Sequence, residues 1–366
     1  MKLPLYRPER YNGKMNTRIN KIIKKLKDQS LDGFILSSPP NISYLTGFRS
    51  RDSYMVVSAK GNFYLTDSRY FQEAKKALAG LTVIQPKASV FEKISEICKD
   101  LRLSCVGFEE RHLSFAEYSR IRKSLSDDIG LAPFYGIIEE ERQTKTREEL
   151  AKIKQAIDIS MDAFRFIRDY IKPGVKEIEI AGELERFIRY HGASTSSFDI
   201  IVGSGPNSSF PHHISSERRI KKDEAVLVDM GVDYAGYKSD LTRVFFSGKM
   251  NPLIRRIYDI VLKAQRSALA GIKPGAMIGK IDSLARDYIG KMGYASYFGH
   301  GLGHGVGLEV HEKPNINKKN DRRLKTGMVF TIEPAIYLPN KFGIRLEDMV
   351  LVTKKGSEVL SGSLDK

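Results

Sequence analysis

Two acidic residues lie inside a strongly apolar, strand-like segment near the middle of this 366-residue chain. Residues 225–246 form two apolar runs around a glycine-containing turn, a pattern typical of a β-hairpin, and they include Asp229 and Asp240. If the hairpin folds about residues 234–235, the two carboxylates lie directly opposite each other, with Cβ atoms roughly 5 Å apart. Two like charges at that distance repel each other unless a cation lies between them. The segment therefore predicts a hairpin built around a bound cation.

The same construction recurs near the end of the chain. Residues 327–352 again form two apolar strands, joined through residues 339–343, and Glu333 and Glu347 are symmetric about Asn340. A second pair of facing carboxylates is therefore expected. One such pair could arise by chance from surface alternation, but two pairs within apolar strands indicate a binding site.

A glycine- and histidine-rich segment, GHGLGHGVGLEVHE, lies between the two hairpins at residues 299–312. Glycine occupies every odd position from 299 to 307, which argues against a helix and favours an extended strand whose bare face lets another backbone approach. His300 and His304 would then share the opposite face. A single histidine is usually an ordinary core or surface residue, but three of the seven histidines lie in this segment, so they are expected to join the site.

Four carboxylates and one imidazole suit two adjacent divalent cations, with one Asp and one Glu bridging them. Such a centre can hydrolyse an amide. A water shared by the two cations loses a proton near neutral pH, and one cation polarises the scissile carbonyl. A neighbouring carboxylate or imidazole then passes the proton to the leaving amine. The sequence thus predicts a dinuclear metal site with hydrolytic activity.

The chain divides into two domains. Residues 15–137 alternate between helix-like and strand-like segments, which indicates an α/β domain. The polar stretch 139–149 contains no core-forming residues, so the boundary is placed there, giving domains 1–140 and 141–366. The second domain is predicted to be α+β. The expected helices of the whole chain cover residues 15–28, 70–79, 90–101, 114–125, a long segment ending at 171, 176–190, 251–270 and 278–291.

Composition limits the possible classes of protein. Hydrophobic residues at 41% and charged residues at 28% are ordinary for a globular protein. The start has no apolar signal segment, and no run approaches the roughly 18 apolar residues that span a bilayer, so a cytoplasmic protein without membrane association is expected. Two cysteines, Cys98 and Cys105, are too few for a disulfide framework.

The formal net charge of +16 raises the possibility of nucleic-acid binding. The densest basic stretch, residues 21–27, interleaves lysines with apolar residues at helical spacing. That pattern is typical of the solvated face of an amphipathic helix, so no nucleic-acid partner is expected.

Taken together, these motifs resemble the pita-bread metallopeptidase family, which includes Xaa-Pro dipeptidase (prolidase), aminopeptidase P and methionine aminopeptidase. The motifs are VDMG, SDLTR, the glycine- and histidine-rich segment, TIEPAIY and IRLED, within residues 195–352. The resemblance implies an α+β protein: a C-terminal pita-bread (creatinase/aminopeptidase) fold with an N-terminal α/β creatinase-like domain. Creatinase is similar in shape but does not retain this complete set of ligands.

The resemblance also implies the metal ligands. Asp229 and Glu347 would bridge two divalent ions, and Asp240 would complete one of the two metal sites. His304 and Glu333 would complete the other. By family resemblance the metal would be manganese, with cobalt, zinc and iron as alternatives, because carboxylate-rich sites accept each of these ions.

The same match implies roles in catalysis. Glu333 would act as general acid/base through the bridging hydroxide, while His212 and His311 would line the pocket and stabilise the tetrahedral intermediate. The neighbouring His213 is expected to be an ordinary loop residue. The residues assigned to the substrate side are His300, Tyr337 and Arg345. The last two would also steady the carboxylates and histidines.

The N-terminal domain bears on the substrate. Methionine aminopeptidases usually lack such a domain, whereas residues 31–48, LDGFILSSPPNISYLTGF, resemble the proline-specific and creatinase-like members. The resemblance therefore implies cleavage between an N-terminal residue and proline, by an aminopeptidase or a dipeptidase. It also suggests a homodimer, since the N-terminal domain often closes part of a neighbouring subunit's site in these enzymes.

Two alternatives stay open at this stage. Relatives of this fold that have lost their metals act as binding proteins, but such proteins normally lose ligands and none is missing here. A broader aminopeptidase acting on N-terminal methionine would use the same metal site with different pocket residues. The chain is short for an aminopeptidase P, which leans weakly towards a dipeptidase.

Overall fold

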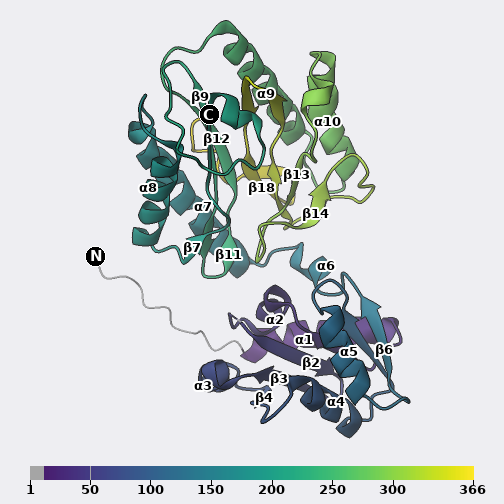
Figure 1. Cartoon of the computed structure of the whole chain (residues 1–366). Helices are drawn as coiled ribbons and strands as arrows, with labels where there is room; N and C mark the ends of the chain where they lie inside the picture. Colours follow the sequence, from purple (N-terminus) through teal and green to yellow (C-terminus); the bar gives the residue numbers. More distant parts are fainter. Residues whose placement is uncertain (1–11, 50) are drawn as a thin grey trace. The chain divides into compact units, whose positions relative to one another are not determined.

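The computed structural model of the protein describes residues 12–49 and 51–366. The chain splits into two compact units, Met1–Glu141 and Arg142–Lys366 (Figure 1). A core cluster of apolar residues from the strands and helices of the first unit lies entirely within that unit. Two further clusters lie within the second unit.

A six-stranded sheet forms the centre of the N-terminal unit, in the order β4-β3-β2-β1-β5-β6. Strands β1, β2 and β3 pair antiparallel, whereas β1–β5, β5–β6 and β3–β4 pair parallel. Its strands are β1 (Gly33–Leu36), β2 (Ser53–Ser58), β3 (Gly61–Thr66), β4 (Thr82–Ile84), β5 (Cys105–Glu109) and β6 (Gly130–Phe134). Its helices are α1 (Asn12–Asp28), α2 (Pro39–Thr46), α3 (Ser68–Ala77), α4 (Val90–Asp100) and α5 (Phe115–Ser124). The predicted alternation of helices and strands is confirmed.

Helix α2 was not expected from the sequence. Pro39 and Pro40 occupy its first positions, where a missing N–H is harmless, and Gly47 ends it with φ of 70°. The helix buries Ile42 and Leu45 against the rest of the unit. A Pro-Pro pair is usually read as a break in structure, and here it is the beginning of a short helix.

The C-terminal unit places helices on both sides of several small sheets. Its helices are α7 (Arg147–Ile167), α8 (Glu177–Tyr190), α9 (Pro252–Ala270) and α10 (Ile278–Lys291), close to the predicted spans. Figure 1 shows α7 and α8 on one side of the strands and α9 and α10 on the other. The strands are β7 (Thr195–Ser196), β8 (Ile201–Ser204), β9 (Ala225–Met230), β10 (Val232–Tyr234), β11 (Tyr237–Lys238), β12 (Leu241–Phe246), β13 (Gly303–Gly305), β14 (Glu312–Ile316), β15 (Val329–Ile332), β16 (Ala335–Leu338), β17 (Phe342–Arg345), β18 (Asp348–Val352) and β19 (Ser357–Val359).

Strand β9 shows how these layers are made. Ala225 and Leu227 belong to the core cluster with α9 and α10, whereas Val226 and Val228 belong to the cluster with α7 and α8. This alternation follows from the period of two along a strand. Asp229 falls on the first of these faces, because it is two residues beyond Leu227.

The first predicted hairpin exists, but its register differs from the prediction. Asp229 lies opposite Thr242, not Asp240. The turn is centred on Ala235 and Gly236, which have φ of 50° and 87°. Two successive positive φ angles are typical of a type I′ turn. Because Asp240 is two residues from Thr242, both carboxylates still lie on one face, as diagonal neighbours.

The second predicted hairpin has the expected register. Strands β16 and β17 pair Ala335 with Arg345, and β15 and β18 pair Ile332 with Asp348. Both pairings are symmetric about Asn340, so Glu333 and Glu347 oppose each other between them. The predicted facing of this pair is confirmed.

The polar stretch 139–149 is less exposed than its composition suggests. It includes the short helix α6 (Glu139–Arg142). Arg142 and Glu149 are both buried. Arg142 binds Glu309 and Glu312, and Lys145 also binds Glu312, at 2.6 Å. The expectation that this stretch contributes nothing to a core was therefore wrong, because paired charges can be buried together.

Candidate metal centre

Three buried carboxylates meet where the two hairpins come together. Oxygen atoms of Asp229, Asp240 and Glu347 lie within 4.8 Å of one another. Asp229 ends the inward face of β9, Asp240 immediately precedes β12, and Glu347 immediately precedes β18. The backbone N–H of Glu347 donates to the carbonyl of Thr242 at 3.2 Å, which joins the two hairpins at this point.

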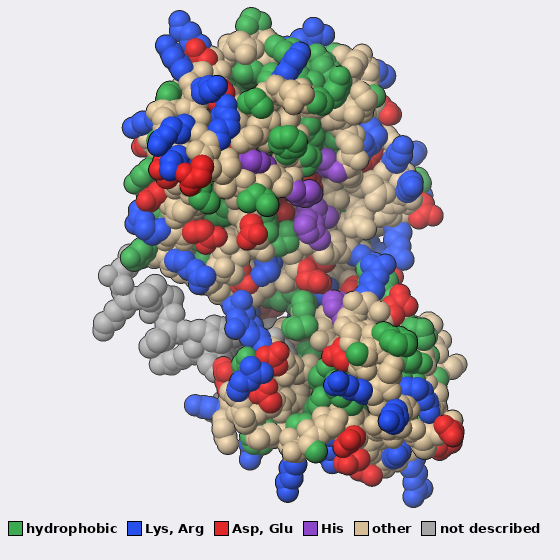
Figure 2. All heavy atoms as spheres, in the orientation of Figure 1, with side chains coloured by type: hydrophobic (Ala, Val, Ile, Leu, Met, Phe, Trp, Pro, Cys, Tyr) green, Lys and Arg blue, Asp and Glu red, His purple; other side chains and the backbone are tan. Residues whose placement is uncertain are grey.

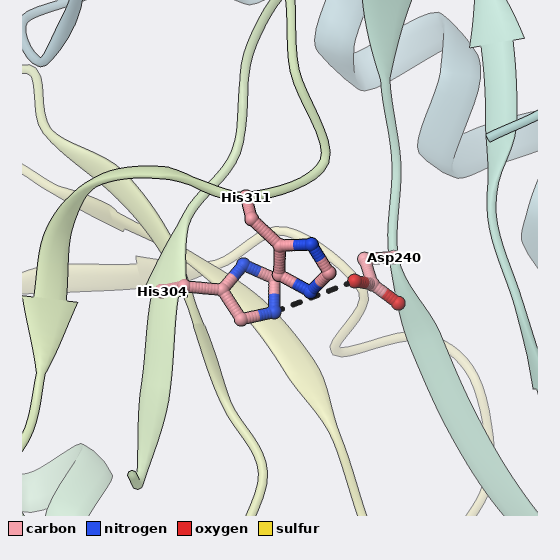
Figure 3. Close-up of side chains that lie close together, drawn as sticks. All are labelled: Asp240, His304 and His311. Carbon is pink, nitrogen blue, oxygen red and sulfur yellow. Dashed lines mark ion pairs between the residues drawn. The ribbon is translucent and has the colours of Figure 1, made fainter. Parts of the chain in front are cut away.

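A second group shares Glu347 with the first. His304, Glu333 and Glu347 also offer ligand atoms within 4.8 Å of one another. His304 Nε2 lies 3.3 Å from Glu333 Oε1 and 3.6 Å from Asp240 Oδ2. Figure 3 shows the imidazoles of His304 and His311 side by side, with Asp240 facing them. The five residues thus form one continuous cluster.

Glycines hold His304 in place. A Cβ atom at Gly303 would lie 1.9 Å from the carbonyl oxygen of Thr331, and one at Gly305 would lie 2.2 Å from that of Lys313. Neighbouring backbones therefore approach the segment closely, as predicted. The predicted long strand is wrong, however, because only Gly303–Gly305 forms β13 and a register shift follows His304.

The carboxylates of the cluster carry more negative charge than the nearby cationic side chains can neutralise. Burial, followed by neighbouring carboxylates, raises the pKa of Asp240 and Glu347 well above their ordinary values. Burial also raises the pKa of Asp229. Among the described residues, Asp229 Oδ1 is buried with no hydrogen-bond partner. Oxygen-rich, buried and under-neutralised donors of this kind fit divalent cations.

Among the residues that the structure describes, Arg345 is the one permanently charged cation in contact with this cluster. Its Nη2 donates to Asp229 and its Nε donates to Thr242 Oγ1 at 3.0 Å. Its Nη1 donates to the Tyr337 hydroxyl. Arg345 therefore fixes one oxygen of Asp229 and leaves the other directed at the cluster. Burial raises the pKa of Tyr337 to about 12, so its hydroxyl keeps its proton.

Glu333 and His304 form a charge-complementary pair. Burial alone would raise the pKa of Glu333, but the hydrogen bond with His304 and the nearby cationic groups lower it below its ordinary value. Burial alone would lower the pKa of His304, and its contact with Glu333 raises it instead. Glu333 is therefore ionised at neutral pH and able to accept a proton.

The cluster lies in a pocket of about 1310 Å³. Each of the remaining predicted site residues lines this pocket: His212, His300, His311, Tyr337 and Arg345. Histidine side chains are visible together on the face shown in Figure 2. The Tyr337 hydroxyl lies 3.3 Å from His300 Nε2. The structure thus brings together every site residue selected from the sequence.

The matches to known proteins come from two regions of the chain. The family model for metallopeptidase family M24 matches residues 151–354. The model for the creatinase/prolidase N-terminal domain matches residues 18–144. The chain belongs to metallopeptidase family M24. It is a hydrolase of that family, and the predicted α+β pita-bread fold with a creatinase-like N-terminal domain is confirmed.

Relatives of this M24 peptidase include proteins named for cleavage at proline. The Xaa-Pro dipeptidase of Pyrococcus furiosus is 36% identical over 95% of this chain and 98% of its own. The structure of an Xaa-Pro dipeptidase from Bacillus anthracis is 37% identical, with a TM-score of 0.93 over 96% of this chain and 99% of its own. That of an X-Pro aminopeptidase from Thermotoga maritima is 35% identical, with a TM-score of 0.85 over 94% and 97%.

Two polar residues of the M24 site were not singled out from the sequence. Thr242 Oγ1 donates to Glu347 at 2.6 Å and accepts from Arg345, so it links a predicted ligand to the guanidinium. Its position two residues after Asp240 was the available signal. Glu177, at the start of α8, accepts from Ser204, Asn207 and Ser216 and contacts His213 Nε2 at 2.9 Å. No sequence signal distinguished it from other helical glutamates.

His213 is a satisfied loop residue, as expected, because Glu177 is its partner. Both His212 and His213 line the pocket, and His212 is the more exposed of the two. Among residues 12–49 and 51–366, no helix combines the length and apolar character needed to cross a membrane.

Proposed function

We propose that this M24 peptidase hydrolyses the peptide bond between an N-terminal residue and proline. The observation that carries the proposal is the convergence of four carboxylates and His304 on the wall of one pocket. The names of the relatives, Xaa-Pro dipeptidase and X-Pro aminopeptidase, support proline at the second position. This assignment is preferred to cleavage after N-terminal methionine, since the creatinase-like N-terminal domain matches residues 18–144.

Two divalent cations, with manganese as the proposed metal, would be held by the cluster. Asp229 and Glu347 are proposed to bridge them, with Asp240 on one side and His304 and Glu333 on the other. When bound, such cations supply Lewis acidity for the scissile carbonyl and lower the pKa of water. Three overlapping groups of donors support a shared centre: Asp229 with Asp240 and Glu347, His304 with Glu333 and Glu347, and Asp240 with His304 and His311. Glu347 belongs to two of these groups, which supports its place between the two ions.

Glu333 is the proposed general acid/base. Its lowered pKa leaves it ionised at neutral pH, so it can take a proton from the attacking water and later deliver it to the proline nitrogen. His304 contacts Glu333 at 3.3 Å and keeps the carboxylate oriented. Glu333 would thus hold the proton between the attack of water and the departure of the proline nitrogen.

The pocket histidines are proposed to serve the substrate. His212 and His311 would donate to the carbonyl oxygen as negative charge develops on it. His300 would contact the bound peptide. Its burial lowers its pKa, so it acts as a neutral hydrogen-bonding group. Tyr337 and Arg345 hold His300 and Asp229 in position through the contacts described above.

The proposal extends to organisation and location. Domains covering residues 1–140 and 141–366, a homodimer and a cytoplasmic location are proposed, on the strength of the family resemblance and of the two compact units. No nucleic-acid partner is proposed. The expected substrates are peptides with proline at the second position.

The proposal is tested by hydrolysis of Ala-Pro, Ala-Pro-Ala and Met-Ala-Ala, using chelated protein with and without added manganese. Cleavage before proline that returns only with metal is the expected result. Cleavage of Met-Ala-Ala alone would assign the protein to the methionine-specific members. No cleavage of any substrate in the metal-loaded protein would overturn the proposal and favour a binding role.

A further inference from the structure

We infer that the substrates of this pocket are peptides that continue beyond proline, and that a free carboxylate on the proline disfavours binding. This inference rests on the proposed function and names its substrate class. In an Xaa-Pro dipeptide the proline carries the terminal carboxylate, next to the scissile bond. In a longer peptide the same position is a neutral amide. The charges of the pocket distinguish these two cases.

The pocket offers no available permanent cation to a carboxylate. Six of its lining residues are carboxylates, and none of the described lining residues is a lysine. Two divalent cations would balance the four carboxylates of the cluster. The remaining carboxylates, Glu185 and Asp199, form no ion pair with another described residue. The pocket is therefore acidic, although the chain as a whole carries a net charge of +16.

Arg345 is the single arginine among the lining residues, and it is already engaged. It is 3% exposed, and its donors are directed at Asp229, Thr242 and Tyr337. Arginine frequently binds a carboxylate through two parallel donors, and those of Arg345 already have partners. Withdrawing Arg345 from Asp229 to bind a substrate would leave a buried carboxylate without its cation.

The remaining side-chain donors among the described lining residues are imidazoles and hydroxyls, and none of them carries a permanent charge. His213 Nε2 contacts Glu177, while His212, His300 and His311 line the pocket. A neutral imidazole N–H can donate to a peptide carbonyl without requiring a charged partner. The donor set therefore suits the amide that follows proline in a longer peptide better than a carboxylate, whose desolvation needs a cation.

The size of the pocket points the same way. Its volume of about 1310 Å³ is larger than the roughly 300–1,000 Å³ typical of pockets that enclose a drug-sized ligand. A dipeptide is smaller than such a ligand. Space therefore remains for residues beyond proline.

The test compares Ala-Pro, Ala-Pro-NH2 and Ala-Pro-Ala with the manganese-loaded full chain. Ala-Pro and Ala-Pro-NH2 differ only in the charge at the C-terminus. We expect kcat/KM for Ala-Pro-NH2 and Ala-Pro-Ala to exceed that for Ala-Pro by about tenfold or more, mainly through KM. Equal or better cleavage of Ala-Pro would overturn the inference while leaving the proposed function intact. No cleavage of all three would instead overturn the proposed function.

A pair of variants tests the electrostatic cause. Glu185→Gln with Asp199→Asn removes the two carboxylates outside the cluster, and it should lower KM for Ala-Pro while leaving Ala-Pro-NH2 nearly unchanged. Glu183→Gln is the control, because it removes one carboxylate from the helix that carries Glu185 but outside the lining residues. An unchanged ratio between the two substrates in the double variant would contradict the assigned cause.

Discussion

At the scale of single residues, the site depends on charges that do not balance within the protein. Burial raises the pKa of Asp229, Asp240 and Glu347, which means that folding brings ionised carboxylates into an unfavourable environment. Arg345 compensates for only part of that charge. The residues are therefore arranged for binding a cation and not for the stability of the empty protein.

Replacing Asp240 by alanine should separate the effect of its carboxylate on metal binding from its effect on the stability of the metal-free protein. We expect Asp240→Ala to lose bound metal and to reduce kcat/KM by more than about 100-fold, the upper loss on removing even an outer partner of a ligand. The metal-free variant should unfold at no lower temperature than the metal-free parent, because a repelled charge has gone. Metal analysis, kinetics and calorimetry measure the three quantities.

Asp287→Ala is the control for that experiment, since Asp287 is an exposed aspartate of α10 outside the pocket. It should retain metal and activity. Full activity in Asp240→Ala would contradict the ligand assignment. Loss of activity in both variants would indicate a general effect of lost charge.

The residues of the site were more predictable than the contacts that hold them. Asp229 and Glu347 stood out because a carboxylate in an apolar strand needs an explanation. Thr242 and Glu177 did not, because a threonine in a strand and a glutamate in a helix are ordinary. Their importance comes from tertiary hydrogen bonds, which no local pattern encodes.

At the scale of elements, the two hairpins show what symmetry in a sequence can predict. The register of the second hairpin followed from the symmetry of its acids about Asn340. The first was displaced, because the turn centres on Ala235 and Gly236 and pairs Asp229 with Thr242. The geometry of the turn sets the register of a hairpin. This turn was hard to predict from the sequence, because alanine rarely adopts the left-handed conformation that Ala235 has here.

The loop that carries His212 and His213 is held by Glu177. Burial alone would raise the pKa of Glu177, but hydrogen bonds from Ser216, His213 and Ser204 lower it below its ordinary value. A lowered folded pKa contributes stability above the unfolded value, near 4.5, and that stability is lost as the pH falls through the folded pKa.

Glu177→Gln should therefore destabilise the protein by about 1–3 kcal/mol at neutral pH, because donors lose their ionic acceptor. The difference from the parent should shrink as the pH falls from 4.5, where the carboxylate of the unfolded parent becomes protonated, through the lower pKa of the folded parent. Urea unfolding at several pH values measures it. A difference that stays constant down to acid pH would show that the charge of Glu177 is not responsible.

A buried ionic cluster anchors the segment that ends at His311. Glu312 is nearly inaccessible and pairs with Arg142 and Lys145, which are equally buried. Glu312→Gln should cost about 3–5 kcal/mol of unfolding free energy, because it leaves buried cations without their counter-ion. Glu358→Gln breaks an exposed pair with Lys154 and should change stability by less than about 1 kcal/mol. Similar losses of unfolding free energy in the two variants would contradict the proposed importance of the buried cluster.

At the scale of the whole molecule, all of the proposed metal ligands belong to one of the two units. These proposed ligands come from β9, the segment before β12, β13 and the residues between β15 and β18, all within Arg142–Lys366. The N-terminal core cluster contains none of them. The sequence predicted the elements of both units well, since their periodic apolar patterns are local, but it missed α2 because Pro-Pro conceals a helix start.

Removal of metal should therefore lower stability in a localised way. At a metal concentration 100 times the dissociation constant, binding contributes about 2.7 kcal/mol, which chelation removes. Calorimetry should show a lower unfolding temperature, restored by manganese. Hydrogen exchange should quicken in β9, β12 and β18 and not in the N-terminal core. Equal loss of protection in both cores would contradict this localisation.

The glycine-rich segment that carries His304 is not uniformly constrained. Gly303 and Gly305 have no room for any side chain, whereas nothing lies within 4 Å of a Cβ atom placed at Gly299, which also lines the pocket. Substitutions by larger residues are therefore excluded at Gly303 and Gly305 but sterically possible at Gly299. A single substitution at Gly299 would add a new surface to the pocket without moving the backbone. This offers evolution, or directed selection, a short route to a different range of peptides.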